Sequence, residues 1–220
     1  MSEVGTFEAV ERVSTTEQVM RALRRAIVSG ELPQGAQLRE VQLAQQLGTG
    51  RSAVREAVRQ LVQEGLVHHE VHRGAFVRMF TPDDIVDVYR AREAVELAAV
   101  ELVLAAESVD LAPLRAALDR LREAAACGSG TWRDMAEADI AFHEALVLRA
   151  GSPRLARMAA TLAAESRMHL LAYPPYSPQR NVEDHERILL ALEQGSAEAV
   201  ELLREHLRYS ARLATEGRQA

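Results

Sequence analysis

The chain has 220 residues, of which 48% are hydrophobic, 26% are charged and 4% are aromatic, and its formal net charge is −6. A composition poor in aromatic residues and rich in Ala, Leu and Glu favours helices and argues against a β-sandwich or a β-barrel. No apolar run reaches the roughly 18 residues of a membrane span, and the polar, acidic N-terminus has no apolar signal core. The single cysteine, Cys127, allows no internal disulfide. We therefore expect a cytoplasmic protein with no membrane segment.

The charge is distributed unevenly along the chain. Residues 1–80 contain 10 Arg and 9 acidic residues, whereas residues 81–220 contain 16 Arg and 23 acidic residues. An asymmetry of this kind indicates two modules that have different partners.

The first module is predicted over residues 14–79. A helix is expected from about Thr16 to Ser29, followed by a short helix in "LREVQLAQQLG" and a third in "RSAVREAVRQLVQEG". The segment "LVHHEVHRGAFVRM" then predicts two short strands around a turn at residues 72–74. Three helices and a small hairpin in about 65 residues make a compact unit.

The second module is predicted over residues 80–216. "TPDD" supplies Thr81 as an N-cap, Pro82 at the first helical position and two acids in the first turn of a helix that extends to about Ala106. Five further helices are expected over residues 110–127, 132–149, 153–172, 179–194 and 196–216. Long helices with short loops predict an antiparallel bundle, so the whole chain is expected to be mainly α.

A basic stripe marks the third helix. Arg51, Arg55 and Arg59 are spaced at i, i+4 and i+8, opposite a Val/Leu stripe, and a tight "LGTG" turn precedes them. A helix-turn-helix places such a helix in the major groove of DNA, where Arg binds guanine or phosphate. The alternative is an ordinary solvated basic face. The hairpin that follows, with Arg73 and Gly74 at its tip, has the shape of a wing and favours DNA binding.

The segment Thr16–Arg78 resembles the winged helix-turn-helix of GntR-family transcriptional regulators, most specifically in "GRSAVREAV", "EGLV" and "RGAFV". The resemblance implies DNA contacts in the major groove from Arg51, Ser52 and Arg55. It also implies that Arg73 and Gly74 place the wing in the neighbouring minor groove.

The sequence departs from the family pattern at three positions. Gly50 stands where Ser is usual, and Gly is an acceptable N-cap at a cost of a few tenths of a kcal/mol. Ala53 stands where Pro is usual. Val41 replaces a basic residue that often contacts the phosphate backbone in relatives, so one such contact is expected to be missing.

Polar residues recur on the apolar faces of the second module. In "EADIAFHEAL" the helical period places Asp139, His143 and Leu146 on one stripe, and His185 and His206 lie on similar apolar stripes. Each His alone could be a satisfied core residue. A buried Asp, however, is costly unless it is paired or bound to a cation. One shared metal ion would explain all four polar residues, because facing helices commonly build metal sites in this way.

The segments "YRAREAVELAAVELVLA", "ADIAFHEALV", "EDHERILLAL" and "LREHL" resemble the FCD ligand-binding domain of the FadR-type branch of the GntR family. The resemblance implies an all-helical bundle that holds a divalent metal with Asp139, His143, His185 and His206. Three nitrogen ligands and one carboxylate suit Zn²⁺, Ni²⁺ or Fe²⁺ without distinguishing among them.

Arg92 is the candidate for effector binding, because a buried Arg can hold a carboxylate in a bidentate pair. The alternative is an intrahelical salt bridge with Glu96, one turn further along. Arg167 and His169 are weaker candidates for the pocket.

Taken together, the motifs predict a metabolite-responsive transcriptional regulator, most simply a repressor that binds a palindromic operator as a homodimer. A small carboxylate bound at the metal would alter operator affinity. Two other functions stay open at this point. A helical metalloenzyme could use the ion to activate water, and a direct metal sensor would have the ion itself as its effector.

Overall fold

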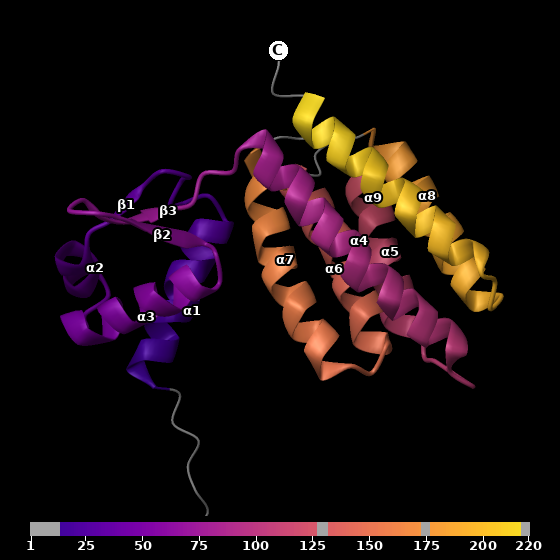
Figure 1. The fold of residues 1–220 in the computed structure, drawn as a ribbon, viewed down its shortest axis with the longest axis horizontal. Coiled ribbons are helices and arrows are strands. Elements are labelled where there is room, and N and C mark those ends of the chain that lie inside the picture. The colour runs from indigo at the N-terminus through magenta and orange to yellow at the C-terminus, as the bar shows by residue number, and fades with distance from the viewer. Residues whose placement is uncertain (1–13, 127–131, 173–176, 217–220) are drawn as a thin grey trace, which may run out of the picture.

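The computed structural model describes residues 14–126, 132–172 and 177–216. These residues form two groups of elements joined by one short segment, with a small group on the left of Figure 1 and a helical bundle on the right. Cys127, on which the disulfide argument rested, lies outside the described residues.

Three helices build the first group, here called the reading head: α1 (Thr15–Val28), α2 (Glu40–Gln46) and α3 (Arg51–Gln63). The α1 helix begins one residue earlier than expected because Ser14 is its N-cap and accepts a hydrogen bond from the Glu17 amide at 3.1 Å. The apolar faces of α1 and α3 pack against each other around Leu23 and Leu61, which are almost fully buried.

A three-stranded antiparallel sheet completes the reading head: β1 (Gln37–Leu38), β2 (Val67–Glu70) and β3 (Gly74–Val77), in the order β1-β3-β2. The predicted hairpin is confirmed, with Val67 opposite Val77 and Glu70 opposite Gly74. Its turn uses positive φ values at His72 (62°) and Gly74 (97°). Sequence analysis missed β1, because two residues are too few to show an alternating pattern.

The bundle begins with α4 (Pro82–Ala105). The predicted N-cap is confirmed and is a full capping box, in which the Thr81 hydroxyl accepts from the Asp84 amide and the Asp84 carboxylate accepts from the Thr81 amide. Arg78, in the segment before α4, also binds Asp84 at 3.0 Å. These contacts give the chain a defined direction as it enters the bundle.

Five more helices follow: α5 (Ala112–Ala126), α6 (Trp132–Arg149), α7 (Pro153–Ala172), α8 (Pro178–Glu193) and α9 (Glu198–Glu216). All lie within two residues of the predicted ranges. Two of them start later than predicted because Asp110 and Ser196 accept hydrogen bonds from amides two residues on. The prediction of a mainly α fold is therefore confirmed.

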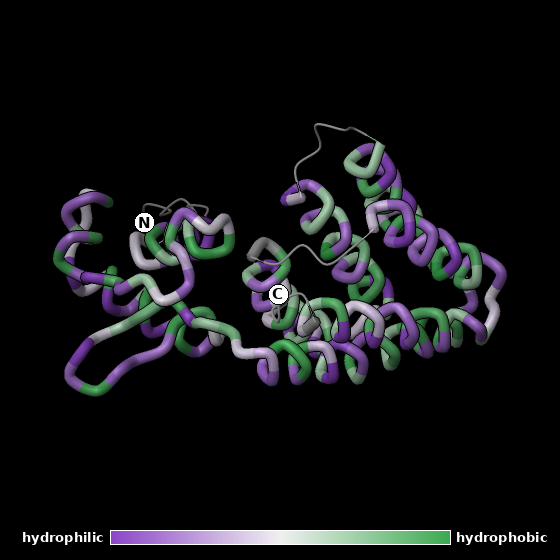
Figure 2. The backbone as a smooth tube through the Cα atoms, turned by 90° about the horizontal axis from the view of Figure 1, so that it is seen from above, coloured by the Kyte–Doolittle hydropathy of each residue, from purple (hydrophilic) through white to green (hydrophobic). Residues whose placement is uncertain are grey.

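Within the bundle, α4 contacts α6, α7 and α9, while α5 packs against α6 and α8. The interior is filled by aliphatic and aromatic side chains from every layer, including Leu121, Phe142, Leu146, Ile188 and Leu203. Figure 2 shows green, hydrophobic positions recurring with purple, hydrophilic ones along each helix, as expected for amphipathic helices. Among helices of the described residues, none combines the length and the apolar character needed to cross a membrane.

The reading head touches the bundle at several points. Helix α1 lies against α7, the bundle helix nearest the head in Figure 1. The Gln34 side chain donates to the Met168 carbonyl oxygen of α7 at 3.0 Å and accepts from the Phe80 amide at 3.2 Å. Arg133 of α6 donates to the carbonyl oxygen of Ser29.

Candidate functional site

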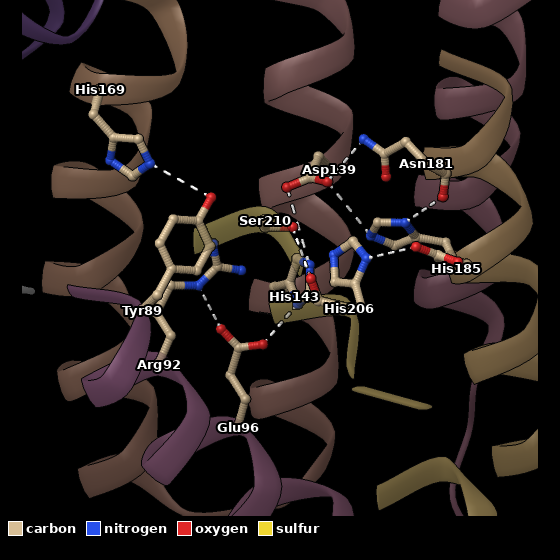
Figure 3. A network of polar contacts seen from close by, with 11 residues as sticks. Tyr89, Arg92, Glu96, Asp139, His143, His169, Asn181, His185, His206 and Ser210 are labelled. Carbon is tan, nitrogen blue, oxygen red and sulfur yellow. Dashed lines mark hydrogen bonds and ion pairs between the residues drawn. The ribbon is translucent and has the colours of Figure 1, made fainter. Parts of the chain in front are cut away.

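Four polar side chains from three helices meet in the interior of the bundle. Asp139 and His143 come from α6, His185 from α8 and His206 from α9, and none is more than 3% exposed. Each offers one ligand atom, and these atoms all lie within 4.8 Å of one another (Figure 3). The structure therefore brings together the four residues that the sequence indicated, here called the buried cluster.

The local reason is the helical period on α6. Asp139 and His143 are one turn apart, and the same stripe carries Phe142 and Leu146, which are fully buried. The Phe142 ring meets the His185 ring edge-on, with centroids 4.7 Å apart. Because Phe142 and Leu146 pack in the core, Asp139 and His143 on the same stripe are buried there as well.

Each imidazole of the buried cluster is oriented through its Nδ1 atom. The partners of His143, His185 and His206 are, in that order, Glu96 Oε2 at 2.6 Å, the Asn181 carbonyl oxygen at 2.8 Å and Asp184 Oδ2 at 3.5 Å. A ligating His typically donates its second ring N–H to a carboxylate or a carbonyl in this way. The Nδ1 contacts leave the Nε2 atoms to face the centre of the buried cluster.

The Nε2 atoms of His143 and His185 are buried and have no hydrogen-bond partner among the described residues. Their distances to the Asp139 carboxylate, 4.0 and 3.6 Å, are too long for hydrogen bonds. Two ligand atoms that share one ion at about 2.1 Å lie at most about 4.2 Å apart. A small contraction would therefore suit the buried cluster to a metal ion, and the four side chains fit such a group.

The protonation states also suit a cation. Burial lowers the pKa of His185 to about 4, with the nearby His206 adding to the effect, and burial also lowers the pKa of His143. Burial by itself raises the pKa of Asp139, but the surrounding imidazoles and Arg92 outweigh it, so that the pKa of this carboxyl is lowered. Near neutral pH the buried cluster thus presents neutral imidazoles at His143 and His185 and one carboxylate at Asp139.

Arg92 lies beside the buried cluster but is already paired. Its Nε atom donates to Glu96 Oε1 at 2.7 Å, and both side chains are almost fully buried. Burial alone raises the pKa of Glu96, yet Arg92 and His143 bring it down to about 2. The intrahelical ion pair that sequence analysis weighed against an effector role is therefore present, and Glu96 joins Arg92 to His143.

Sequence analysis did not find the residues that orient the imidazoles. Asn181 lies four residues before His185 on α8, and its side-chain amide also donates to Asp139 Oδ1 at 3.1 Å. Asp184 directly precedes His185 in sequence but contacts His206 on another helix. Asn181 could have been predicted, because it lies one helical turn before His185 on the same helix. The contact of Asp184 with His206 joins two helices, so no local spacing in the sequence indicates it.

Arg167 and His169, the two weaker pocket candidates, lie in different parts of the structure. Arg167 forms ion pairs with Glu137 at 3.0 Å and Glu144 at 2.8 Å, on the side of α7 that faces an open cleft beside the reading head. His169 is buried and its Nε2 atom lies 3.5 Å from the Tyr89 hydroxyl. Neither belongs to the buried cluster.

Little space remains beside the buried cluster. One cavity of about 10 Å³ lies between α4, α6 and α7 against Arg92, Glu96 and His143. Another of about 40 Å³ opens near Asp184 and His206. Holding one water takes roughly 10–15 Å³, so an organic acid would need a neighbouring helix to move.

The predicted reading residues lie on the surface of the head. Arg51 and Ser52 are exposed in the first turn of α3, and Arg55 follows one turn later. Arg55 is held by Glu40 of α2, with Nε and Oε2 3.1 Å apart. The inner face of α3, with Val54, Ala57, Val58 and Leu61, is buried against the head's core, so Arg51, Ser52 and Arg55 lie on its exposed side.

The predicted wing is the β2–β3 hairpin. Arg73 is exposed at its turn, pairs with Glu70 and places its guanidinium 5.2 Å from the centre of the Phe76 ring. Gly74 is exposed and has a φ of 97°, a conformation that a side chain would strain. Val41, predicted to lack a phosphate contact, is an exposed apolar side chain on α2.

A helix-turn-helix with a wing, joined to a helical bundle that carries a buried Asp/His₃ cluster, defines a DNA-binding regulator with a ligand-binding domain. The family model for bacterial regulatory proteins of the gntR family matches residues 15–77, and the FCD domain model matches residues 87–209. The chain belongs to the GntR family of transcriptional regulators and contains an FCD domain. FCD domains often bind metal, and the buried Asp/His₃ group is one that could hold an ion.

Known relatives have the same architecture. The chain is 31% identical to a probable D-xylose utilization operon transcriptional repressor of Paenarthrobacter nicotinovorans, over 90% of this chain and 87% of that relative. The crystal structure of a GntR transcriptional regulator from Rhodococcus sp. RHA1 has a TM-score of 0.78 at 32% identity, covering 90% of this chain and 96% of that one. E. coli McbR/YncC has a TM-score of 0.77 at 26% identity, covering 93% and 99%. The first is described as a transcriptional repressor and the second as a transcriptional regulator.

Proposed function

We propose that this regulator is a repressor that binds a palindromic operator as a homodimer, through a DNA-binding domain at residues 14–79. The exposed Arg51, Ser52 and Arg55 at the start of α3 would enter the major groove, and the hairpin with Arg73 and Gly74 would reach the adjacent minor groove. Two half-sites one helical turn apart need two heads, which is the argument for a dimer. The relative from Paenarthrobacter, itself described as a repressor, supports the sign of regulation.

The domain at residues 80–216 would bind a divalent ion, Zn²⁺, Ni²⁺ or Fe²⁺, through Asp139, His143, His185 and His206. The observation that carries this proposal is the pair of buried Nε2 atoms, on His143 and His185, that face the Asp139 carboxylate without a hydrogen bond. An orphaned buried polar atom costs about 1–3 kcal/mol. Two such atoms in one place support a ligand that both of them bind.

Charge balance supports the class of effector. Arg92 is positive and Glu96 and Asp139 are negative. Imidazoles that bind a metal ion are neutral, so these buried groups together would carry a net charge of −1 before the ion is added. A divalent ion would bring this to +1 and supply the positive charge that a small carboxylate needs. An acid with a single charge would then leave a neutral interior, which is the least costly arrangement in a low dielectric. Arg92 would face that acid from its pair with Glu96.

Two alternatives use the same buried cluster. A metalloenzyme needs a base for an ion-bound water, but Glu96 and Asp184 each already contact a histidine Nδ1 atom. A direct metal sensor would release DNA on metal addition alone. The geometry favours the acid-responsive regulator over the enzyme, and an experiment separates it from the sensor.

The test compares wild type with His185→Ala and with His169→Ala, a control that removes an equally buried imidazole outside the buried cluster. We expect about one divalent ion per chain in wild type and in the control, and a loss of ion in His185→Ala. Binding to DNA that the wild-type protein selects from a random pool should survive in wild type and in His185→Ala. His169→Ala is a control for metal content alone, because its ring packs against Phe80 where the head joins the bundle. A panel of organic acids should release that DNA only from metal-loaded protein.

Three results would count against the proposal. Metal-free wild type that still responds to an acid would remove the ion from the effector site and leave Arg92 as its anchor. Release of DNA by the ion alone would establish the metal sensor. Turnover of simple esters or phosphates by the loaded protein would establish the enzyme.

A further inference from the structure

Helix α7 separates two very different spaces. On one side its Ala159, Leu162 and Ala163 side chains line the cavity of about 10 Å³ beside Arg92, Glu96 and His143. On the other side its Ala160, Ala164 and Arg167 side chains line an open cleft of about 910 Å³ between the reading head and the bundle. Helix α7 thus has the filled interior of the bundle on one side and the open cleft on the other.

The other two helices that line the small cavity, α4 and α6, are joined by a contact to the Glu96 carboxylate. Glu96 of α4 binds Arg92 on its own helix and His143 on α6, through contacts of 2.7 and 2.6 Å. Moving α4 from α6 would break a buried charge-assisted contact, which costs several kcal/mol. The side chains that α7 contributes there are apolar. Its ion pairs to α6, from Arg167 to Glu137 and Glu144, have carboxylates that are 46% and 33% exposed and are therefore weaker than the buried contact. A group entering the cavity therefore displaces α7 at the lowest cost.

The C-terminal half of α7 carries the contacts to the reading head. The Met168 carbonyl oxygen accepts from Gln34 Nε2 at 3.0 Å, and Glu165 lies 3.5 Å from Arg78. Glu165 also lies close to Gly65, since a Cβ built on that glycine would come within 2.6 Å of Glu165 Oε1. A displacement of α7 therefore reaches the C-terminal end of α3 and the loop before β1 directly.

Gln34 is the most specific of these contacts. Its amide joins three segments, because Nε2 donates to α7 while Oε1 accepts from the Phe80 amide in the segment that leads into α4. Phe80 is buried, with its ring edge-on to His169 of α7 at 6.5 Å. The orientation of the head relative to α4 thus depends on where α7 places its Met168 carbonyl.

We propose that α7 is the element that couples the buried cluster to the reading head, and that Gln34 is the positioning residue through which it sets the orientation of the head. This inference rests on the proposed function, in which a ligand beside the buried cluster changes DNA affinity. It names the helix that the ligand moves and the contact that transmits the movement.

In the test, a substitution that enlarges a side chain lining the small cavity takes the place of the unidentified ligand. Ala163→Leu adds a side chain to a cavity that cannot hold it, so α7 must shift outward. We expect affinity for DNA selected by wild type to fall at fixed salt by about fivefold or more, the lower end of known couplings between sites. Ala117→Leu, at a fully buried position on α5 that does not line this cavity, is the control and should leave DNA affinity unchanged.

Gln34→Glu then tests the transmission. It keeps an oxygen acceptor for the Phe80 amide and replaces the donor to Met168 by a negatively charged oxygen, which repels the Met168 carbonyl oxygen. In this background we expect Ala163→Leu to change DNA affinity less than twofold (about 0.4 kcal/mol), because the contact that transmits the shift is gone. A simple loss of stability would instead give the same fold-change in both backgrounds, since independent effects add. If Ala163→Leu does not fold by circular dichroism, Ala163→Val enters the same cycle.

An equal fold-change in both backgrounds overturns the inference, and so does a folded Ala163→Leu with wild-type affinity. Metal analysis of the same samples separates this result from the proposed function. Wild type without metal would overturn the proposed metal site, while the cycle would still report whether α7 and Gln34 are coupled.

Discussion

Two arginine–glutamate pairs, one in each module, have similar geometry and opposite surroundings. Arg55 and Glu40 in the reading head are 3.1 Å apart with side chains 71% and 28% exposed, whereas Arg92 and Glu96 in the bundle are 2.7 Å apart and only 4% and 5% exposed. A surface pair is worth about 0–1 kcal/mol and exchanges partners readily. A buried pair is costly to break, because it leaves an uncompensated charge. The Arg55 guanidinium of the head can therefore leave Glu40 and bind DNA, whereas the Arg92 guanidinium of the bundle stays paired with Glu96.

The largest expected effect comes from breaking the buried pair. Glu96→Ala leaves Arg92 charged and unpaired in the core and removes the Nδ1 partner of His143, so we expect a loss of about 3–5 kcal/mol in unfolding free energy. Glu93→Ala on the same helix removes a surface partner of Arg208 and should cost about 0–1 kcal/mol. Urea unfolding of both variants gives the comparison. Equal losses would show that burial does not distinguish the two pairs.

Lower pH should destabilise the metal-free bundle. The pKa of His185 is about 4 in the folded state against a usual 6.5, so below pH 6.5 the unfolded state binds more protons. Stability is then full above pH 6.5 and falls as the pH drops to about 4. A shift of this size corresponds to roughly 3 kcal/mol, and the lowered pKa of His143 acts in the same direction. Urea unfolding between pH 7 and 4 measures it.

His185→Gln is the control for this pH dependence, because Gln cannot take up a proton in that range. Its stability should change less between pH 6.5 and 4. The contribution of Glu96 enters only at the acid edge of this window, since its pKa of about 2 means that its stabilisation is lost as the pH falls from the usual 4.5 to about 2. An unchanged slope in the variant would show that His185 does not set the pH dependence.

In the reading head, Arg55→Ala should weaken binding to selected DNA by about 1–3 kcal/mol if Arg55 contacts a base. Its effect on random DNA should be smaller, because random sequences rarely offer the same base. Arg59→Ala is the control on the same helix face, one turn further from the exposed N-terminus and paired with Glu56. Fluorescence titration at fixed salt compares the three proteins. Equal losses on both DNAs would assign Arg55 to phosphate.

The smallest effect is expected at the wing. Arg73→Ala should weaken selected and random DNA by the same factor and reduce the slope of log affinity against log salt by about 1, the signature of one lost phosphate contact. Titrations over a series of salt concentrations measure the slope. A loss confined to selected DNA would instead show that the wing reads sequence.

The local features of this protein were predictable in detail, and contacts between elements were not. The N-cap at Thr81 was visible in four consecutive residues, and the i, i+4 spacing placed Asp139 and His143 on one buried stripe. Strand β1 was not predicted, because it is defined only by its pairing with β3. Asp184 was missed because its partner His206 lies 22 positions further on.

The sequence by itself determined the helices, their apolar faces and the polar residues those faces carry, because these follow from a period that neighbouring residues share. Only the tertiary structure decided that Glu96 would bridge Arg92 and His143, and that His143 and His185 would turn their Nε2 atoms toward Asp139. It also decided that α7 would lie between the buried cluster and the head. Such contacts depend on how helices pack, and packing is set by the shape of many side chains together.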